Sequence, residues 1–221
     1  MKINADLTAR AVVLPDDGKW VPSPLAGVER YMLDRDGEEV ARATSLVRYA
    51  PNSRFDQHIH GGGEEFLVLD GVFSDESGDF GPGTYVRNPI GTAHAPWSDG
   101  GCTICVKLQQ FDKDDTKRVV IDTKAADQSS WQKIREGLSL LMLHEFGTEK
   151  VALFRFAPGA KVDEHVHALG EEVFVLEGTL EDEFGTYPQG SWLRNPDGSK
   201  HSAWSEDGCL LFTKVGHLPA A

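Results

Sequence analysis

The chain contains an internal repeat in which one pattern of histidine and glutamate residues occurs twice. The two copies are His58-Ile-His60-Gly-Gly-Gly-Glu64 followed by His94, and His165-Val-His167-Ala-Leu-Gly-Glu171 followed by His201. Each of these side chains moves by the same step of about 107 positions. A stretch of about 62 residues aligns with its copy without a gap, and roughly 27 of these positions are identical. A repeat of this length indicates a duplicated domain rather than a solenoid unit, so we expect two domains with the same fold.

The extent of the repeat predicts the domain boundaries. Trp20 and Trp131 are equivalent if a few residues are skipped, so the repeat begins near Trp20. The join falls in the polar stretch 112–130. We therefore predict an N-terminal domain over residues 1–115 and a C-terminal domain over residues 116–221, which suits the usual size of a compact domain.

The composition favours a cytoplasmic protein whose main partners are neither nucleic acids nor membranes. The formal net charge is −13 and the pI is about 5.0, which disfavours a nucleic-acid groove or an anionic membrane surface. No apolar run approaches the length of a membrane span, and the first residues lack the apolar segment of a signal peptide. We expect the chain to act in the cytoplasm.

The three cysteines are expected to be packing residues. Cys102 and Cys209 occupy equivalent positions of the repeat, and free cysteines are often buried. Cys102 and Cys105 also form a Cys-x-x-Cys pair of the kind found in zinc and redox sites. Residues three apart on a strand point to opposite faces, however, and the second copy has Phe212 in place of Cys105. We therefore expect neither a zinc nor a redox role for this pair.

Short strands dominate the local pattern. Alternating or continuous apolar residues predict strands over Thr44–Ala50, Phe66–Leu69, Gly83–Arg87, Cys102–Gln109, Lys150–Ala157, Val173–Leu176, Gly190–Arg194 and Cys209–Lys214. Tight turns are expected at Asp70-Gly71 and at Glu177-Gly178. The one helical segment that we expect is short, over Ser130–Glu136. Many short antiparallel strands predict an all-β sandwich or barrel.

The repeated histidines and the glutamate fit one face of such strands. His58 and His60 are two residues apart, so both side chains face the same way on an extended strand. Glu64 shares their parity and begins the next strand, whereas Glu65 has the opposite parity. We therefore predict Glu64 as a ligand and Glu65 as an outward-facing or supporting residue. His94 follows a Pro-x-Gly turn that can bring a distant strand back against this pair.

This pattern predicts two metal sites. The first comprises His58, His60, Glu64 and His94, and the second comprises His165, His167, Glu171 and His201. Three imidazoles and a carboxylate suit a divalent transition metal, and inside a barrel they would be costly without a metal or hydrogen bonds. A single His-x-His pair can be a solvated face, but the intact duplicate favours metal. Zinc, iron, manganese and nickel all suit these ligands, and we favour zinc.

Other repeated residues can support these sites. Arg87 can pair with Glu65 behind the ligands or form an exposed salt bridge. Asp56 can accept a hydrogen bond from a ligand histidine, and Asp75-Glu76 has the pattern of a solvated strand tip. The same holds for their copies Arg194, Glu172, Asp163 and Asp182-Glu183.

The spacing of these residues resembles the motifs of the cupin superfamily. The second copy contains Gly159-x5-His165-x-His167-x3-Glu171-x6-Gly178, similar to the first cupin motif, and Gly190-x5-Pro196-x-Gly198-x2-His201, similar to the second. The first copy matches equally well, except that Asn52 replaces the opening glycine. The resemblance implies an all-β bicupin, that is, two tandem jelly-roll β-barrels from an internal duplication.

A narrower resemblance is to the cupin domain of ChrR-type anti-sigma factors. It rests on Glu64–Glu76, on Gly83–Pro89 and on the Gly-Cys after the last histidine. It implies a zinc-type site and a role in sensing oxidants. The His-x3-Cys-x2-Cys motif of the sigma-binding domain has no counterpart here, so a sigma factor is a doubtful partner. The same subgroup includes dioxygenases of small diketones and hydroxyacetophenones.

Two functions therefore stay open, and the family resemblance favours the first. The chain is either a metal-binding regulatory or sensor protein, or a non-haem Fe(II)-type dioxygenase of a small diketone or hydroxyacetophenone-like substrate. Three histidines and a glutamate leave room on a metal for a bidentate enolate and O₂, but the sequence assigns no catalytic residue. A metal-free structural cupin is disfavoured because both ligand sets are kept. The expected partners are a small-molecule ligand or oxidant in the barrel and a second copy of the chain.

Overall fold

The computed structural model describes residues 1–220, and they form two compact β-strand units. The first unit contains residues 1–5 and 19–125, and the second contains residues 6–18 together with the chain from residue 126 onward. The expected all-β fold is confirmed. Within the described residues, no helix is long and apolar enough to cross a membrane.

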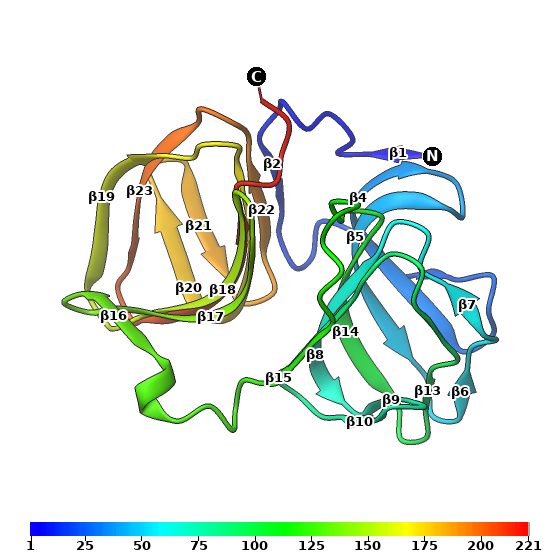
Figure 1. The fold of residues 1–221 in the computed structure, drawn as a ribbon. Coiled ribbons are helices and arrows are strands. Elements are labelled where there is room, and N and C mark those ends of the chain that lie inside the picture. The colour runs from blue at the N-terminus through cyan, green and yellow to red at the C-terminus, as the bar shows by residue number, and fades with distance from the viewer. Residues whose placement is uncertain (221) are drawn as a thin grey trace. The chain divides into compact units, whose positions relative to one another are not determined.

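The first unit is built from antiparallel strands in a larger and a smaller sheet (Figure 1). Its strands are β1 (Lys2–Ile3), β3 (Val21–Pro22), β4 (Val28–Gly37), β5 (Ala41–Tyr49), β6 (Ser53–Arg54), β7 (His58–Ile59), β8 (Glu64–Gly71), β9 (Phe73–Asp75), β10 (Gly78–Phe80), β11 (Thr84–Asn88), β12 (Ala93–His94), β13 (Trp97–Ser98), β14 (Cys102–Leu108) and β15 (Val119–Asp122). The larger sheet has the order β1-β4-β5-β14-β8-β11-β15, with β3 also paired to β4, and the smaller has the order β10-β9-β13-β6. The short pair β12-β7 stands apart from both sheets.

The second unit repeats this arrangement. Its elements are β2 (Ala11–Val13), the single 3₁₀ turn η1 (Gln128–Ser130), β16 (Gln132–Arg135), β17 (Leu138–Phe146), β18 (Glu149–Phe156), β19 (Ala160–Val166), β20 (Glu171–Asp182), β21 (Gly185–Pro188), β22 (Trp192–Asn195), β23 (Lys200–Ser205) and β24 (Cys209–Val215). The main sheet has the order β16-β17-β18-β24-β20-β22-β2. Strand β23 pairs with β19 and with β20, and β21 pairs with β20.

Apolar side chains form the core of each barrel. The first core includes Tyr49, Phe66, Val68, Phe73, Phe80, Cys102 and Ile104, and the second includes their copies Phe156, Val173, Val175, Leu180, Tyr187, Cys209 and Leu211. Buried and more exposed residues alternate along strand β23, since a strand's side chains point to opposite faces in turn. The repeated apolar pattern thus gives two cores of the same design.

The strand that leads into each repeat closes the sheet of the other unit. Strand β2 precedes the first repeat but pairs with β22 of the second unit, with Val12 opposite Leu193 (Figure 1). Strand β15 precedes the second repeat but pairs with β11 of the first unit, with Val120 opposite Val86. Both additions cover a sheet edge that would otherwise expose unpaired backbone groups. The predicted boundary between residues 115 and 116 differs from this division, because β2 belongs to the second unit and β15 to the first.

Two local predictions were wrong. The segment expected to be helical, Ser130–Glu136, contains strand β16, and only the single turn η1 before it is helical. A helix of so few residues has little stability of its own, so pairing with β17 decides the conformation. The expected tight turns are also replaced by strand: Asp70-Gly71 ends β8, and Glu177-Gly178 lies within the continuous strand β20, whose register with β24 shifts between Val175 and Glu177.

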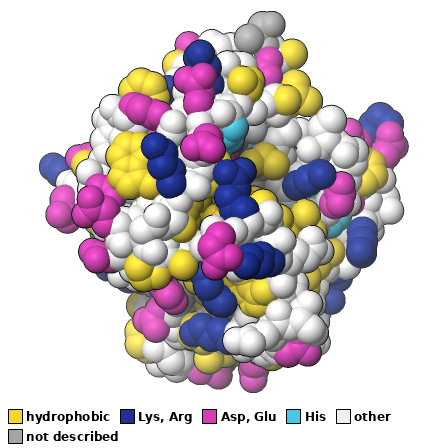
Figure 2. Space-filling view, turned by 90° about the vertical axis from the view of Figure 1, so that its left-hand side faces the viewer, with side chains coloured by type: hydrophobic (Ala, Val, Ile, Leu, Met, Phe, Trp, Pro, Cys, Tyr) yellow, Lys and Arg dark blue, Asp and Glu magenta, His cyan; other side chains and the backbone are white. Residues whose placement is uncertain are grey.

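Acidic and basic side chains share the face of the molecule shown in Figure 2. In Figure 2, acidic side chains lie among the basic ones over the face in view, with apolar side chains between them. The net charge of −13 is therefore the excess of a mixed surface rather than the result of few basic residues.

We expect Gly178→Ala to destabilise the second unit more than Gly159→Ala does. Both glycines have a positive φ, 71° and 76°, which costs an alanine roughly 1–2 kcal/mol. A Cβ at Gly178 would also lie 2.1 Å from the carbonyl oxygen of Gly208, whereas a Cβ at Gly159 would meet nothing within 4 Å. The overlap should add about 1–3 kcal/mol, which urea unfolding of both variants can measure. Equal stabilities would contradict this packing.

Candidate metal centres

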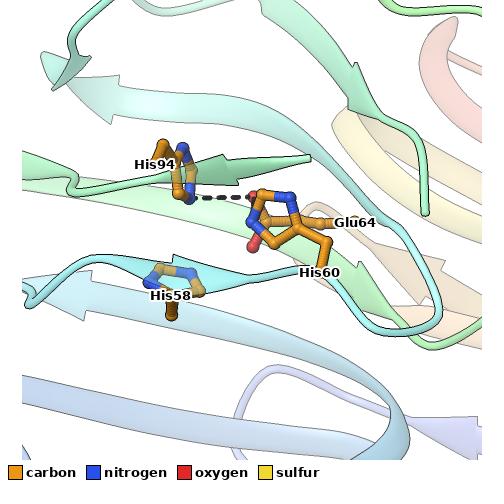
Figure 3. Close-up of side chains that lie close together, drawn as sticks. All are labelled: His58, His60, Glu64 and His94. Carbon is orange, nitrogen blue, oxygen red and sulfur yellow. Dashed lines mark ion pairs between the residues drawn. The ribbon is translucent and has the colours of Figure 1, made fainter. Parts of the chain in front are cut away.

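Strand pairing brings the first set of predicted ligands together. His58 on β7 lies directly opposite His94 on β12 in the antiparallel register. His60 follows β7, and Glu64 is the first residue of β8, as the parity of the sequence predicted. His60, Glu64 and His94 are buried, whereas His58 is half-buried. All four side chains face one another (Figure 3).

The distances in this first cluster suit a common ion. The three imidazole rings have centroids 4.6–5.2 Å apart. The Oε1 atom of Glu64 lies 3.5 Å from the Nε2 atom of His60 and 3.5 Å from that of His94. One ligand atom from each of the four residues falls within 4.8 Å of all the others. The residues named from the sequence thus form one group that could hold a metal ion.

The second set forms an equivalent but slightly wider cluster. His165 on β19 lies opposite His201 on β23, and the three imidazole centroids are 4.8–5.0 Å apart. Glu171 begins β20, with its Oε2 atom 3.5 Å from the Nε2 atom of His167 and 4.0 Å from that of His201. The group whose ligand atoms all lie within 4.8 Å contains the three histidines without Glu171. The carboxylate therefore stands farther from its histidines here than in the first cluster.

The state of the imidazole nitrogens fits metal binding. The Nε2 atoms of His60, His94 and His167 are buried and have no hydrogen-bond partner among residues 1–220. A buried polar atom without a partner is costly, whereas a coordinated metal would satisfy it. These atoms face the centre of each cluster, so the residues present fit a divalent metal with nitrogen and oxygen ligands.

In the first histidine of each His-x-His pair, the Nδ1 atom is hydrogen-bonded to a backbone carbonyl. The Nδ1 atom of His58 donates to the carbonyl oxygen of Asp56 at 3.1 Å, and that of His165 donates to Asp163 at 3.0 Å. The sequence predicted the residue that accepts this hydrogen bond, and the acceptor is its backbone rather than its carboxylate. Since a carbonyl oxygen can only accept, Nδ1 carries the proton and Nε2 presents its lone pair to the cluster.

His60 is oriented by a hydroxyl in the same way. Its Nδ1 atom lies 2.9 Å from the Oγ1 atom of Thr92. The Thr92 hydroxyl donates its proton to the carbonyl of Pro89 at 2.7 Å, so its oxygen accepts from His60. This again leaves the Nε2 atom of His60 as the metal-facing lone pair.

The prediction of a solvated tip at Asp75-Glu76 and Asp182-Glu183 was wrong for the aspartates. Asp75 and Asp182 are only 3% and 4% exposed, and each accepts a hydrogen bond from the last histidine of its set. The Nδ1 atom of His94 lies 3.1 Å from Asp75, and that of His201 lies 3.2 Å from Asp182. A carboxylate behind a ligand imidazole fixes its tautomer and raises its basicity. The identical spacing of aspartate and histidine in both copies was the available signal.

Arg87 is the buried partner of Glu65, which is one of the two roles that the sequence left open for this arginine. Arg87 lies 2.8 Å from Glu65 with both side chains fully buried, so the alternative of an exposed salt bridge is wrong in the first unit. The Tyr85 hydroxyl also donates to Glu65 at 2.6 Å, and Asp115 pairs with Arg87 at 2.7 Å. In the second unit, the copy Arg194 donates to the backbone carbonyl of Asp6 at 2.8 Å. Glu65 therefore supports the barrel wall and does not face the cluster.

The electrostatic environment keeps the inner histidines neutral. Burial lowers the pKa of His60 and of His167, with Glu64 and Glu171 acting in the opposite direction. Burial also lowers the pKa of His201, but hydrogen bonding to Asp182 and the charge of Glu171 outweigh it, so the pKa is raised overall. Only a neutral imidazole can bind a metal, so the lowered pKa values favour binding near neutral pH.

The equivalent cysteines are inert packing residues. Cys102 and Cys209 are free, buried thiols of the two cores. Burial raises the pKa of each thiol to about 11, against a smaller opposite effect of hydrogen bonds to Ser98 and Ser205. The reactive species is the thiolate, so these thiols resist oxidation at neutral pH.

Each cluster lines a cavity inside its barrel. The first cavity has a volume of about 320 Å³ and the second about 410 Å³. Besides the metal-type ligands, apolar side chains form much of both walls: Val47, Phe55, Ile104 and Val106 in the first, and Leu138, Phe154, Phe156 and Leu211 in the second. The ligand atoms therefore face space that can admit a small molecule.

Two β-barrels with repeated histidine and glutamate sets inside them define this chain as a two-domain cupin. The chain belongs to the family of the ChrR cupin-like domain, whose model matches residues 8–112 and 116–219. No curated protein sequence matches the chain.

Several solved structures share the fold. A candidate dioxygenase from Nostoc punctiforme has a TM-score of 0.74 at 16% identity, covering 100% of this chain and 84% of that one. A candidate glyoxylate-induced protein from Pseudomonas aeruginosa has a TM-score of 0.75 at 14% identity, covering 96% and 92%. Oxalate decarboxylase from Bacillus subtilis has a TM-score of 0.60 at 12% identity, covering 94% and 77%. At these identities the likeness shows the fold alone.

We expect elemental analysis to find about two divalent metal ions per chain, one for each cluster. Either His60→Ala or His167→Ala should remove one of them, and the double variant should remove both, because each histidine lends a buried Nε2 atom to its own cluster. Ile59→Ala and Val166→Ala are matched controls, since these neighbouring side chains are 72% and 62% exposed. Metal content that does not respond to the histidine variants would contradict these sites.

Proposed function

We propose that the chain is a metal-dependent bicupin that binds a small organic molecule beside the metal in its barrels and oxidises it as a dioxygenase. One observation carries the proposal: the converging ligand atoms line cavities of about 320 and 410 Å³ instead of being packed over. Three imidazoles and a carboxylate leave one or two positions open on a five- or six-coordinate ion, and catalytic metal sites keep such an open position. A cavity beside the donors favours a site that takes up a further ligand.

The chemistry of the donor set is compatible with this function. When bound, a redox-active ion such as iron(II) supplies electrons to O₂ and acts as a Lewis acid towards an oxygen-bearing substrate. The protein's own contribution is to hold the imidazoles in one tautomer and to exclude water. Asp75 and Asp182 fix the tautomers of His94 and His201 through hydrogen bonds to their Nδ1 atoms. The apolar cavity walls exclude water.

The size and lining of the cavities support a small, largely apolar substrate. Their volumes lie at the lower end of the usual range for ligand pockets, about 300–1,000 Å³. A small diketone or a hydroxyacetophenone-like molecule combines a hydrocarbon body with the oxygen atoms that a metal would bind. Such a substrate matches both the apolar wall and the donors at its end.

The two cavities differ in the hydroxyl of a tyrosine. Tyr49 lines the first cavity, and the equivalent residue in the second is Phe156. The Tyr49 side chain is buried, and its ring packs against Phe55 and Phe73. Burial raises the pKa of Tyr49, as does the nearby charge of Glu64, so the hydroxyl stays protonated and can donate. The first cavity therefore favours a substrate with an additional acceptor atom.

A second candidate is a regulatory role in response to oxidants. Its support is membership of the ChrR cupin-like domain family. The raised pKa values of Cys102 and Cys209 direct any such response to the metal ligands rather than to the thiols. Here the measurable event would be release of metal by peroxide, with no substrate turnover.

We expect the iron(II)-loaded protein to consume O₂ with a small diketone or hydroxyacetophenone and without an added reductant, because a dioxygenase places both oxygen atoms in its products. Loss of the carboxylate ligands in Glu64→Ala combined with Glu171→Ala should abolish uptake, which an oxygen electrode can follow. Ile59→Ala serves as the control with both ligand sets intact. No uptake across such substrates, together with metal release by peroxide, would favour the regulatory role instead.

We also expect the ligand affinity of each cavity to depend on whether a tyrosine or a phenylalanine stands at this position of its wall. Tyr49→Phe should weaken binding of an acceptor-bearing ligand in the first cavity by about 2- to 13-fold, since a hydrogen bond contributes roughly 0.5–1.5 kcal/mol. Phe156→Tyr should strengthen it in the second. Calorimetric titration with each barrel's metal site removed in turn measures both effects. Affinities that are insensitive to both changes would show that the hydroxyl does not meet the ligand.

A further inference from the structure

Arg10 of the N-terminal segment reaches the metal cluster of the second unit through an asparagine. Its Nε atom donates to the Oδ1 atom of Asn195 at 3.1 Å. The Nδ2 atom of Asn195 in turn donates to the Oε2 atom of Glu171 at 3.1 Å. Because the arginine can only donate, it fixes which end of the amide faces Glu171. The Glu171 carboxylate therefore always faces the NH₂ group of Asn195.

The same guanidinium reaches the cluster by a second route. Its Nη2 atom lies 3.0 Å from the Oδ2 atom of Asp182 and 2.7 Å from the hydroxyl of Tyr187. Asp182 is the carboxylate that accepts the Nδ1 proton of His201 at 3.2 Å. Tyr187 donates to the other oxygen of Asp182 at 2.6 Å. One side chain thus contacts the supporting groups of both the glutamate and the last histidine.

In the first unit, an equivalent arginine contacts the asparagine that supports the glutamate, but its other contact is to a serine. Arg118 precedes β15 as Arg10 precedes β2, and its Nε atom donates to Asn88 at 3.3 Å. Asn88 donates to Glu64 at 3.3 Å. The Nη2 atom of Arg118 bonds the hydroxyl of Ser77 at 2.9 Å instead of an aspartate.

The residues around each arginine account for this difference. Ser77 and Phe80 of the first unit are replaced by Phe184 and Tyr187 in the second. The guanidinium of Arg10 lies 5.0 Å from the ring centre of Phe184 and 5.7 Å from that of Tyr187. These rings and the Tyr187 hydroxyl hold it against Asp182, whose side chain is fully buried.

We propose that Arg10 is a positioning residue for the metal ligands of the second cupin, and that this centre is complete only when the segment 6–18 is paired into the second unit as β2. The inference rests on the proposed metal binding. The planar fork of an arginine can hold two acceptors at fixed positions, which a lysine cannot. Arg10, which precedes His165 by 155 positions in the sequence, thus completes the site that His165–His201 begin.

The expected size of the effect follows from the kind of contact. Loss of a group that orients a metal ligand typically weakens metal affinity by about 10–100-fold. Arg10 acts on two ligands of the second centre, and Arg118 acts on one of the first. We therefore expect the larger loss from the change at Arg10.

The test measures Co²⁺ affinity at each centre separately, by competition with a coloured chelator. His60→Ala leaves the second centre and His167→Ala leaves the first. Added to the former, Arg10→Met should weaken Co²⁺ binding by about 10–100-fold and alter its visible spectrum. Added to the latter, Arg10→Met should change neither. Arg118→Met is the matched control, with an effect confined to the first centre and smaller in size.

Two further measurements separate positioning from folding. Thermal unfolding of the metal-free variants reports any general loss of structure. Arg10→Lys keeps the charge and the strand, and should still lose affinity, because one ammonium group cannot serve both Asn195 and Asp182. Wild-type Co²⁺ affinity and spectrum at the second centre in Arg10→Met or Arg10→Lys would overturn the inference alone. Failure of the unaltered chain to bind Co²⁺ would overturn the proposed function with it.

Discussion

The pairing of the His-x-His strand with the strand of the last histidine is the interaction on which the rest of this structure depends. Opposite positions in the register place His58 beside His94, and His165 beside His201. This pairing directs imidazole nitrogens into barrel interiors that are otherwise apolar, where an unpartnered polar atom is costly. Every Nδ1 atom described above has an acceptor, so the unpartnered Nε2 atoms of His60, His94 and His167 are the ones that a metal could satisfy.

The sequence predicts this arrangement well where side-chain parity alone decides it. The two-residue spacing of His58 and His60, and the position of Glu64 at the start of a strand, follow from the alternation of a strand's faces. The roles of Asp75 and Arg10 do not follow. An Asp-Glu pair next to a turn has the composition of a solvated tip, and its burial depends on which sheet covers it. Arg10 finds its partners only after β2 has crossed to the second unit, which no local pattern encodes.

The duplication provides an internal comparison of what has been kept and what has diverged. The ligands, the aspartates behind them and the asparagine–glutamate contact are the same in both units. The walls and supports differ, with Tyr49 in one cavity and a phenylalanine in the other. Chemistry that depends on the metal is therefore common to both centres, whereas ligand choice is free to differ between them. A fold as widely used as this one gains its specificity from such local groups.

Both functions considered for the chain place the reactive event at the metal cluster. The thiols that could otherwise respond to an oxidant are buried, and a pKa of about 11 keeps them protonated at neutral pH. A sensor built on this fold must therefore lose or alter its metal, whereas an enzyme must retain it through each turnover. The two-armed contact of Arg10 holds Glu171 and His201 together, and a site reinforced in this way resists release of its ion. That reinforcement, together with room for a substrate beside the donors, favours the enzyme.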